Sequence, residues 1–211
     1  MVDVIIKNGI VITLNVKRSI IENGAVAIEG DRIVDVGDTS KILNDYNSNR
    51  VIDASKMAVL PGLMDGHAHA GHGLLKSLGL HNEMWYKACE EIYSQASTEE
   101  FWYADALLTN LERLKFGTTT GVSFLGGGDS VMRVDHPIFA ERHSDAVEDI
   151  GLRTFLAVGP RRPPYPRKYS RWDEDARRDY MVDFDDMVNN SEKIIKRNHL
   201  RNNGRINIAI M

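Results

Sequence analysis

The sequence has 211 residues, 43% of them hydrophobic and 27% charged, which is enough to bury a globular core. A formal net charge of −4 gives no general attraction to nucleic acid, and the single cysteine, Cys89, excludes an internal disulfide framework and a cysteine-built zinc site. No apolar run approaches the ~20 residues of a membrane-spanning helix. We therefore expect a cytoplasmic protein that binds neither nucleic acid nor membrane.

Residues 2 to about 57 are rich in β-branched side chains and predict a sheet. Two such runs surround the Asn8-Gly9 pair in DVIIKNGIVITL, a signature typical of a hairpin turn. The pattern repeats around residues 29–31 in GAVAIEGDRIVDVG, and a further strand follows in RVIDASKMAVL. We predict a small antiparallel sheet that forms one layer of a β-sandwich domain over residues 1–57.

From about residue 58, strand and helix patterns alternate. We predict strands at 59–64, 118–125, 152–159 and 205–211, and helices at 83–95, 98–116, 137–150 and 182–199. A basic, proline-rich segment, residues 161–178, is predicted to be a solvated loop. Such alternation is typical of an α/β fold whose parallel strands are joined by helices. A closed barrel needs eight strands, so we expect residues 58–211 to be the first four strands of a TIM-type (β/α)8 barrel and the chain to be the first half of a longer protein.

The strand at 59–64 leads into a stretch with two histidines, VLPGLMDGHAHAGHGLLKSLG. In extended backbone, residues i and i+2 point to the same side, so His67 and His69 share a face. Two imidazoles at a strand end form half of a transition-metal site, because Zn, Fe, Ni and Cu accept nitrogen ligands. For a bare pair, two ordinary structural histidines are an open alternative, but the turn at Pro61-Gly62 and the glycine at Gly66 favour the metal site.

Asp65 lies two residues before His67, on the same face of the strand. Asp65 is a candidate to support a metal ligand without binding the metal itself. That it is an ordinary carboxylate at the end of a strand is an equally open alternative.

These residues resemble a known family, the amidohydrolase superfamily of metal-dependent hydrolases. The motifs that carry the resemblance are VLPGLMDGHAHA, the β segment before it, and the later LLKSLG, ERLKFGTTTGVSF and GLRTFLAVG, so it extends over essentially the whole chain. Within the superfamily the chain is most similar to the branch of cytosine deaminase, chlorohydrolases and S-adenosylhomocysteine deaminases. The resemblance implies one divalent transition metal, Zn or Fe(II), with His67 and His69 as ligands. It places the general acid/base beyond Met211, so no catalytic residue is expected within this chain.

The activity implied by the resemblance is hydrolysis of a C–N or C–Cl bond in a nitrogen heterocycle by a metal-activated water molecule, as in deaminases and chlorohydrolases. One alternative is a binuclear cyclic-amide hydrolase, similar to dihydroorotase or imidazolonepropionase, which adds a carboxylated lysine at the end of strand four. The segment INIAIM contains no lysine. A second alternative is an inactive truncated or split half-barrel. The implied partners are a small heterocyclic substrate, the missing C-terminal half and, once complete, further copies in a homo-oligomer.

Two further residues are candidate substrate contacts. Trp85 matches a tryptophan that related deaminases place over the ring-binding pocket, where its face would pack against a flat heterocycle. A tryptophan that packs in the core is an equally open alternative. His72 follows after the strand has ended, so we expect it to face the substrate or the surface rather than to bind the metal.

Overall fold

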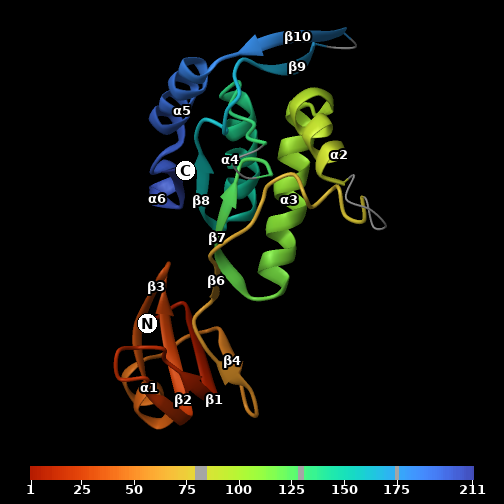
Figure 1. The fold of residues 1–211 in the computed structure, drawn as a ribbon. Helices are drawn as coiled ribbons and strands as arrows, with labels where there is room; N and C mark the ends of the chain where they lie inside the picture. Colours follow the sequence, from red (N-terminus) through yellow and green to blue (C-terminus); the bar gives the residue numbers. More distant parts are fainter. Residues whose placement is uncertain (79–84, 128–130, 174–175) are drawn as a thin grey trace. The chain divides into compact units, whose positions relative to one another are not determined.

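The computed structural model describes residues 1–78, 85–127, 131–173 and 176–211 (Figure 1). The chain divides into two compact units, Met1–Gly62 and Leu63–Met211. Within the described part, no helix combines the length and the apolar character needed to cross a membrane.

The first unit is a single five-stranded sheet with one helix packed on it. The antiparallel strands are β1 (Val4–Ile12), β2 (Ile20–Glu29) and β3 (Arg32–Asp38), and β4 (Val51–Asp53) and β5 (Ala58–Val59) pair with β1 in parallel. The helix α1 (Thr39–Asp45) buries Ile42 against Ile5, Ala25 and Ala27. The predicted sheet is confirmed, but the prediction that it is wholly antiparallel is wrong. Hairpins give antiparallel neighbours, whereas the chain crosses through α1 before β4 and so returns beside β1 in parallel.

The Asn8-Gly9 pair forms a bulge inside β1 and not the predicted hairpin turn. Asn8 has a φ of 62°, and the register between β1 and β2 shifts on both sides of Gly9. The N–H of Asn8, which leaves the ladder, donates to Thr39 Oγ1 at 3.0 Å. A residue with positive φ serves a bulge as well as a turn, so the dipeptide alone does not distinguish the two. The connection between β1 and β2 is made by residues 13–19.

The second unit contains a four-stranded parallel sheet in the order β11-β8-β7-β6, of which Figure 1 labels β6, β7 and β8. Its strands are β6 (Leu63–Asp65), β7 (Thr118–Phe124), β8 (Arg153–Val158) and β11 (Ile206–Ile210). The helix α3 (Glu99–Lys115) contacts β7, α4 (Ile138–Ile150) contacts β8 and β11, and α5 (Phe184–Asn198) contacts β11. The predicted α/β alternation is confirmed. The strand expected at 59–64 is divided, because Pro61-Gly62 separates β5, which belongs to the first sheet, from β6.

Shorter elements complete the second unit. The helix expected at 83–95 is observed as α2 (Trp85–Glu91) and a π-helical turn, Ile92–Ala96; residues 83–84 lie outside the described residues. The short helix α6 (Arg201–Gly204) precedes β11.

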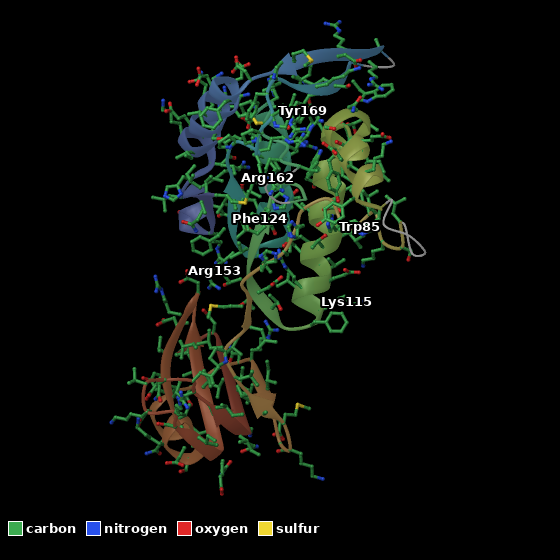
Figure 2. The ribbon with its side chains drawn as sticks, viewed as in Figure 1. Trp85, Lys115, Phe124, Arg153, Arg162 and Tyr169 are labelled. Atoms are coloured by element: carbon green, nitrogen blue, oxygen red, sulfur yellow. The ribbon has the colours of Figure 1, made fainter. Side chains whose placement is uncertain are left out.

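Residues 161–178, predicted as a solvated loop, are largely a β-hairpin. Its strands β9 (Arg167–Asp173) and β10 (Ala176–Val182) pair in antiparallel register (Figure 1). Tyr169 is fully buried and donates to the Met132 carbonyl at 2.8 Å (Figure 2). Arg161, just before the hairpin, is 3% exposed and donates to Glu90 Oε1 at 2.7 Å. The loop prediction is wrong because the many basic residues conceal the strand pattern. Tyr169 and Tyr180 pair across the two strands and pack in the core, whereas Trp172 is 40% exposed.

The helix α4 carries a buried imidazole. His143 is 2% exposed, and among the described residues neither ring nitrogen has a hydrogen-bond partner. Burial, and to a smaller extent the nearby charge of Arg113, lower the pKa of His143 from 6.5 to about 3. The ring is therefore neutral in the folded protein at neutral pH.

This burial predicts an acid-sensitive contribution to stability. The unfolded chain takes up a proton at His143 below pH 6.5, and the folded chain does so only near pH 3, so the contribution is complete above pH 6.5 and is lost as the pH falls towards 3. Between pH 7 and pH 5 the free energy of unfolding should fall by about 2 kcal/mol more in the wild type than in His143→Leu. Urea titrations of both proteins at the two pH values measure this difference. Equal losses of stability in the two proteins would show that His143 takes up a proton as readily in the folded chain as in the unfolded chain.

Candidate metal centre

The two histidines of the sequence motif lie on an irregular continuation of β6. Regular pairing ends at Asp65, but the N–H of Phe124 donates to the Ala68 carbonyl and the N–H of Ala70 donates to the Phe124 carbonyl, both at 2.8 Å. Residues 66–70 therefore run parallel to the end of β7. Asp65 pairs with Gly121 and His69 with Phe124, so four residues of the motif span three of β7 and one extra residue lies at the break. Asp65 therefore faces Arg113, on the side of the sheet opposite the two imidazoles, and the prediction that Asp65 shares a face with His67 is wrong.

The rings of His67 and His69 point to one place, as the spacing predicts. Their Nε2 atoms are 3.2 Å apart, and the ring planes are inclined at 80°. The Nδ1 of His69 lies 3.2 Å from the Gly126 carbonyl, which can only accept, so in the neutral ring Nδ1 carries the proton and Nε2 offers its lone pair. The ring of Phe124, which Figure 2 labels, packs against both imidazoles, with centroids at 5.1 and 5.3 Å.

The surroundings of His69 and His72 favour neutral imidazoles. Burial lowers the pKa of His69; the hydrogen bond to Gly126 opposes this, and the charge of His67 adds to it. Burial and the charge of His69 also lower the pKa of His72. A neutral imidazole is the form that binds a metal ion. The donors, their convergence and the carbonyl behind His69 all suit a divalent transition metal.

Asp65 lies behind the backbone of His67 and does not contact the imidazole in the described structure. Its Oδ1 accepts from the His67 N–H at 3.2 Å, and its Oδ2 accepts from Nη2 of Arg113 at 2.8 Å. Partial burial raises the pKa of Asp65, but the hydrogen bonds from Arg113 and His67 outweigh it, so this pKa lies below its usual value. Asp65 is thus a charged, paired carboxylate at the root of the motif.

The two candidate substrate residues lie beside the histidine pair. The ring of His72 stacks on His69 and on Tyr93, with centroids at 5.3 and 5.7 Å, and its Nδ1 shares a hydrogen bond with the Tyr93 hydroxyl. Trp85, at the start of α2 (Figure 2), meets His72 edge-on at 6.3 Å and also packs against the core. The structure brings both residues to the centre, and their contact with substrate stays a prediction.

Asp105 is a residue of this region that the motifs do not reveal. It is a fully buried residue of α3 and accepts from the N–H groups of Gly71 at 2.6 Å and Leu74 at 2.9 Å. Gly71 has a φ of +96°, and a Cβ there would lie 2.6 Å from Cε1 of Tyr93, so only glycine allows the chain to pass this ring. Asp105 therefore holds the turn that carries His72. The only sequence signal is an aspartate among the apolar residues of FWYADALL.

Removing this carboxylate should loosen the turn. Asp105→Ala leaves the buried N–H of Gly71 and the part-buried N–H of Leu74 without an acceptor and should lower the free energy of unfolding by about 2–3 kcal/mol. Leu111→Ala, a half-exposed position on the same helix, should cost less than about 1 kcal/mol. Urea denaturation measures both values, and amide exchange at Gly71 and Leu74 should accelerate in Asp105→Ala only. Unchanged exchange at these two amides would contradict the assignment.

The described residues contain two candidate metal ligands close together, His67 and His69. Among the described residues, no group of three or more His, Cys, Asp or Glu side chains could hold a metal ion. The imidazoles of His67 and His69 are two candidate ligands, whereas a tetrahedral zinc site has four.

The sequence and the fold of the chain were compared with those of known proteins. Residues 24–46 match the bacterial imidazolonepropionase-like composite domain. The chain is 35% identical over 159 residues to the 5'-deoxyadenosine deaminase of Methanococcoides burtonii, a match that covers 75% of this chain and 33% of that protein. The fold of a zinc-bound adenosine deaminase from Xanthomonas campestris matches 99% of this chain and 42% of its own, with a TM-score of 0.73 at 19% identity. Together these matches support a place for the chain in the amidohydrolase superfamily.

A further solved structure has the same amidohydrolase fold. The atrazine chlorohydrolase TrzN of Arthrobacter aurescens, complexed with zinc, matches with a TM-score of 0.71 at 20% identity over 98% of this chain and 46% of its own. The present chain spans about a third of the curated relative and less than half of either solved amidohydrolase. The resemblance seen in the His67 and His69 motif is supported for the superfamily.

Proposed function

We propose that the chain is the N-terminal part of a metal-dependent hydrolase. In this proposal, residues 1–57 form the small β-sandwich domain and residues 58–211 the first four strands of a (β/α)8 barrel. The parallel sheet supports the barrel, because its strands are neighbours in chain order, as barrel strands are. An apolar pocket of about 230 Å³ on the first sheet, lined in part by Ile6, Val26 and Ile33, supports a second layer there.

The reaction that we propose is hydrolysis of a C–N or C–Cl bond of a nitrogen heterocycle, with deamination as the first candidate. The observation that carries it is the convergence of Nε2 of His67 and Nε2 of His69 at the carboxyl end of a parallel strand, where the active sites of such barrels lie. The names of the similar proteins support the substrate class, since they are deaminases of adenosine derivatives and a triazine chlorohydrolase.

The residues of the chain have distinct parts in this proposal. A divalent cation, Zn or Fe(II), would act as a Lewis acid and lower the pKa of a water molecule. His67 and His69 would hold it, the Gly126 carbonyl orients the His69 ring, and Phe124 shields the pair from solvent on one side. Trp85 and His72 would pack against the flat heterocycle. The general acid/base is proposed to lie outside this chain.

Two alternatives are distinguished by particular observations. The match to an imidazolonepropionase-like composite domain is compatible with a binuclear cyclic-amide hydrolase, but β11 carries no lysine, which favours a mononuclear centre. An inactive half-barrel is the other alternative. Because two imidazoles leave a tetrahedral ion half-coordinated, we expect the 211-residue chain alone to bind metal weakly and to have negligible turnover.

Metal binding by the histidine pair is directly testable. Titration of the chain with Co²⁺, followed by absorption and by the NMR signals of the histidine rings, should show one weak site that shifts His67 and His69 together. Replacing either histidine with glutamine should weaken binding by about tenfold or more, since half of the available ligands is lost. His136→Asn is the matched control, because asparagine can still accept from the Ile138 N–H that His136 binds.

The reaction is tested with the natural polypeptide that contains these 211 residues. Release of ammonia from adenosine or 5'-deoxyadenosine, or of chloride from a chlorotriazine, should require the metal and both histidines. Hydrolysis of a cyclic amide alone would favour the binuclear alternative. If the histidine variants bound Co²⁺ as the wild type does, the proposed centre would be wrong.

A further inference from the structure

Arg113, in the last turn of α3, is a buried cation whose guanidinium is fully hydrogen-bonded. Nε and Nη2 donate to Oδ2 of Asp65 at 3.1 and 2.8 Å. Nη1 donates to Asn110 Oδ1 and Ser123 Oγ, both at 3.0 Å. Nη2 also donates to the Val122 carbonyl at 2.9 Å. These bonds use the five donors of an arginine side chain, so α3, β7 and Asp65 together fix its position.

The strand β7 is shaped to admit this side chain. A Cβ at Gly121 would lie 2.6 Å from Cζ and 2.7 Å from Nη1 of Arg113. Any other residue at this position would displace the guanidinium or the strand. Gly121 is therefore required by the close approach of Arg113 to the backbone of β7.

Asp65 joins this arginine to the candidate metal centre. One carboxylate oxygen is held by Arg113, and the other accepts from the N–H of His67 at 3.2 Å. Gly66 lies between Asp65 and His67, directly after the last residue of β6. The ion pair thus constrains the chain at the point where it turns towards the two imidazoles.

We propose that Arg113 is a positioning residue which, through Asp65, sets the backbone from which His67 and His69 converge on the metal. This inference rests on the proposed metal-binding function. A purely structural ion pair is the competing explanation. Buried ion pairs stabilise a fold little compared with well-packed apolar side chains, whereas their fixed geometry is suited to orienting a neighbouring group.

The test compares Arg113→Met and Arg113→Lys with Arg201→Met in the 211-residue chain. Arg201 also pairs with an aspartate, Asp145, at 2.7 Å, but that pair joins α6 to α4. The first readout is made without metal: the imidazole ¹⁵N shifts of His67 and His69 and the NOEs between their rings. The second readout is Co²⁺ affinity, and urea denaturation records the stability of each variant.

Arg113→Met should change the ring signals and weaken Co²⁺ binding by about tenfold, within the range typical of residues that support metal ligands. Arg113→Lys keeps the charge but not the five donors, so its effect should be smaller. Gly121→Ala, which keeps the arginine but displaces it, should resemble Arg113→Met. Arg201→Met should lose stability only.

The inference would be overturned if Arg113→Met and Gly121→Ala kept the wild-type ring signals and affinity. Should Arg113→Met not fold, Arg113→Lys carries the same comparison, and unchanged ring signals there also overturn it. Failure of the wild type to bind Co²⁺ at the two histidines would instead refute the proposed function. The ring signals of the metal-free proteins would still decide the role of Arg113.

Discussion

The backbone pairing of residues 68–70 with Phe124 is the interaction on which the candidate centre depends. The strand β6 has only three residues and ends before the histidines. Two hydrogen bonds of 2.8 Å between Ala68, Ala70 and Phe124 restore the parallel ladder beyond the break. Without them, residues 66–70 would form a loop, and the side chains of His67 and His69 would have no reason to share a face. Phe124 also packs its ring on both imidazoles, so strand pairing and side-chain packing position the same two groups.

Buried charged side chains organise the irregular backbone around this centre. Arg133, fully buried, donates to the carbonyls of Tyr93 at 2.6 Å and Ser170 at 2.7 Å, and so joins the π-helical turn to the β9–β10 hairpin. Asp105 accepts from two N–H groups of the turn at residues 71–74. Buried backbone outside helices and sheets needs hydrogen-bond partners, and here side chains provide them. The order of this region therefore depends on a few long-range contacts and not on regular secondary structure.

The sequence predicts those parts of the structure that depend on local periodicity. Apolar spacing identifies α3, α4, α5 and three of the parallel strands, and the i, i+2 spacing predicts that His67 and His69 face the same way. It does not reveal Asp105 or Arg113, whose partners Gly71 and Asp65 lie 34 and 48 residues away in the chain. Contacts of this kind arise only when α3 packs beside β7. The β9–β10 hairpin and the bulge at Asn8 are not predicted for a different reason. The basic, proline-rich composition of residues 161–178 indicates a loop, and the Asn8-Gly9 pair indicates a hairpin turn, so in both places the strand is missed.

The strand β7 is the element that connects these observations, since its two faces have separate tasks. On the helix-facing side, Gly121 leaves room for Arg113 and Ser123 accepts one of its hydrogen bonds. On the opposite side, Phe124 contacts both imidazoles, and beyond the strand the Gly126 carbonyl fixes the tautomer of His69. The histidine pair is thus held by two routes, through its rings from one face of β7 and through Asp65 from the other. A change on either face would disturb the convergence of the two Nε2 atoms, although no residue of β7 is a candidate metal ligand.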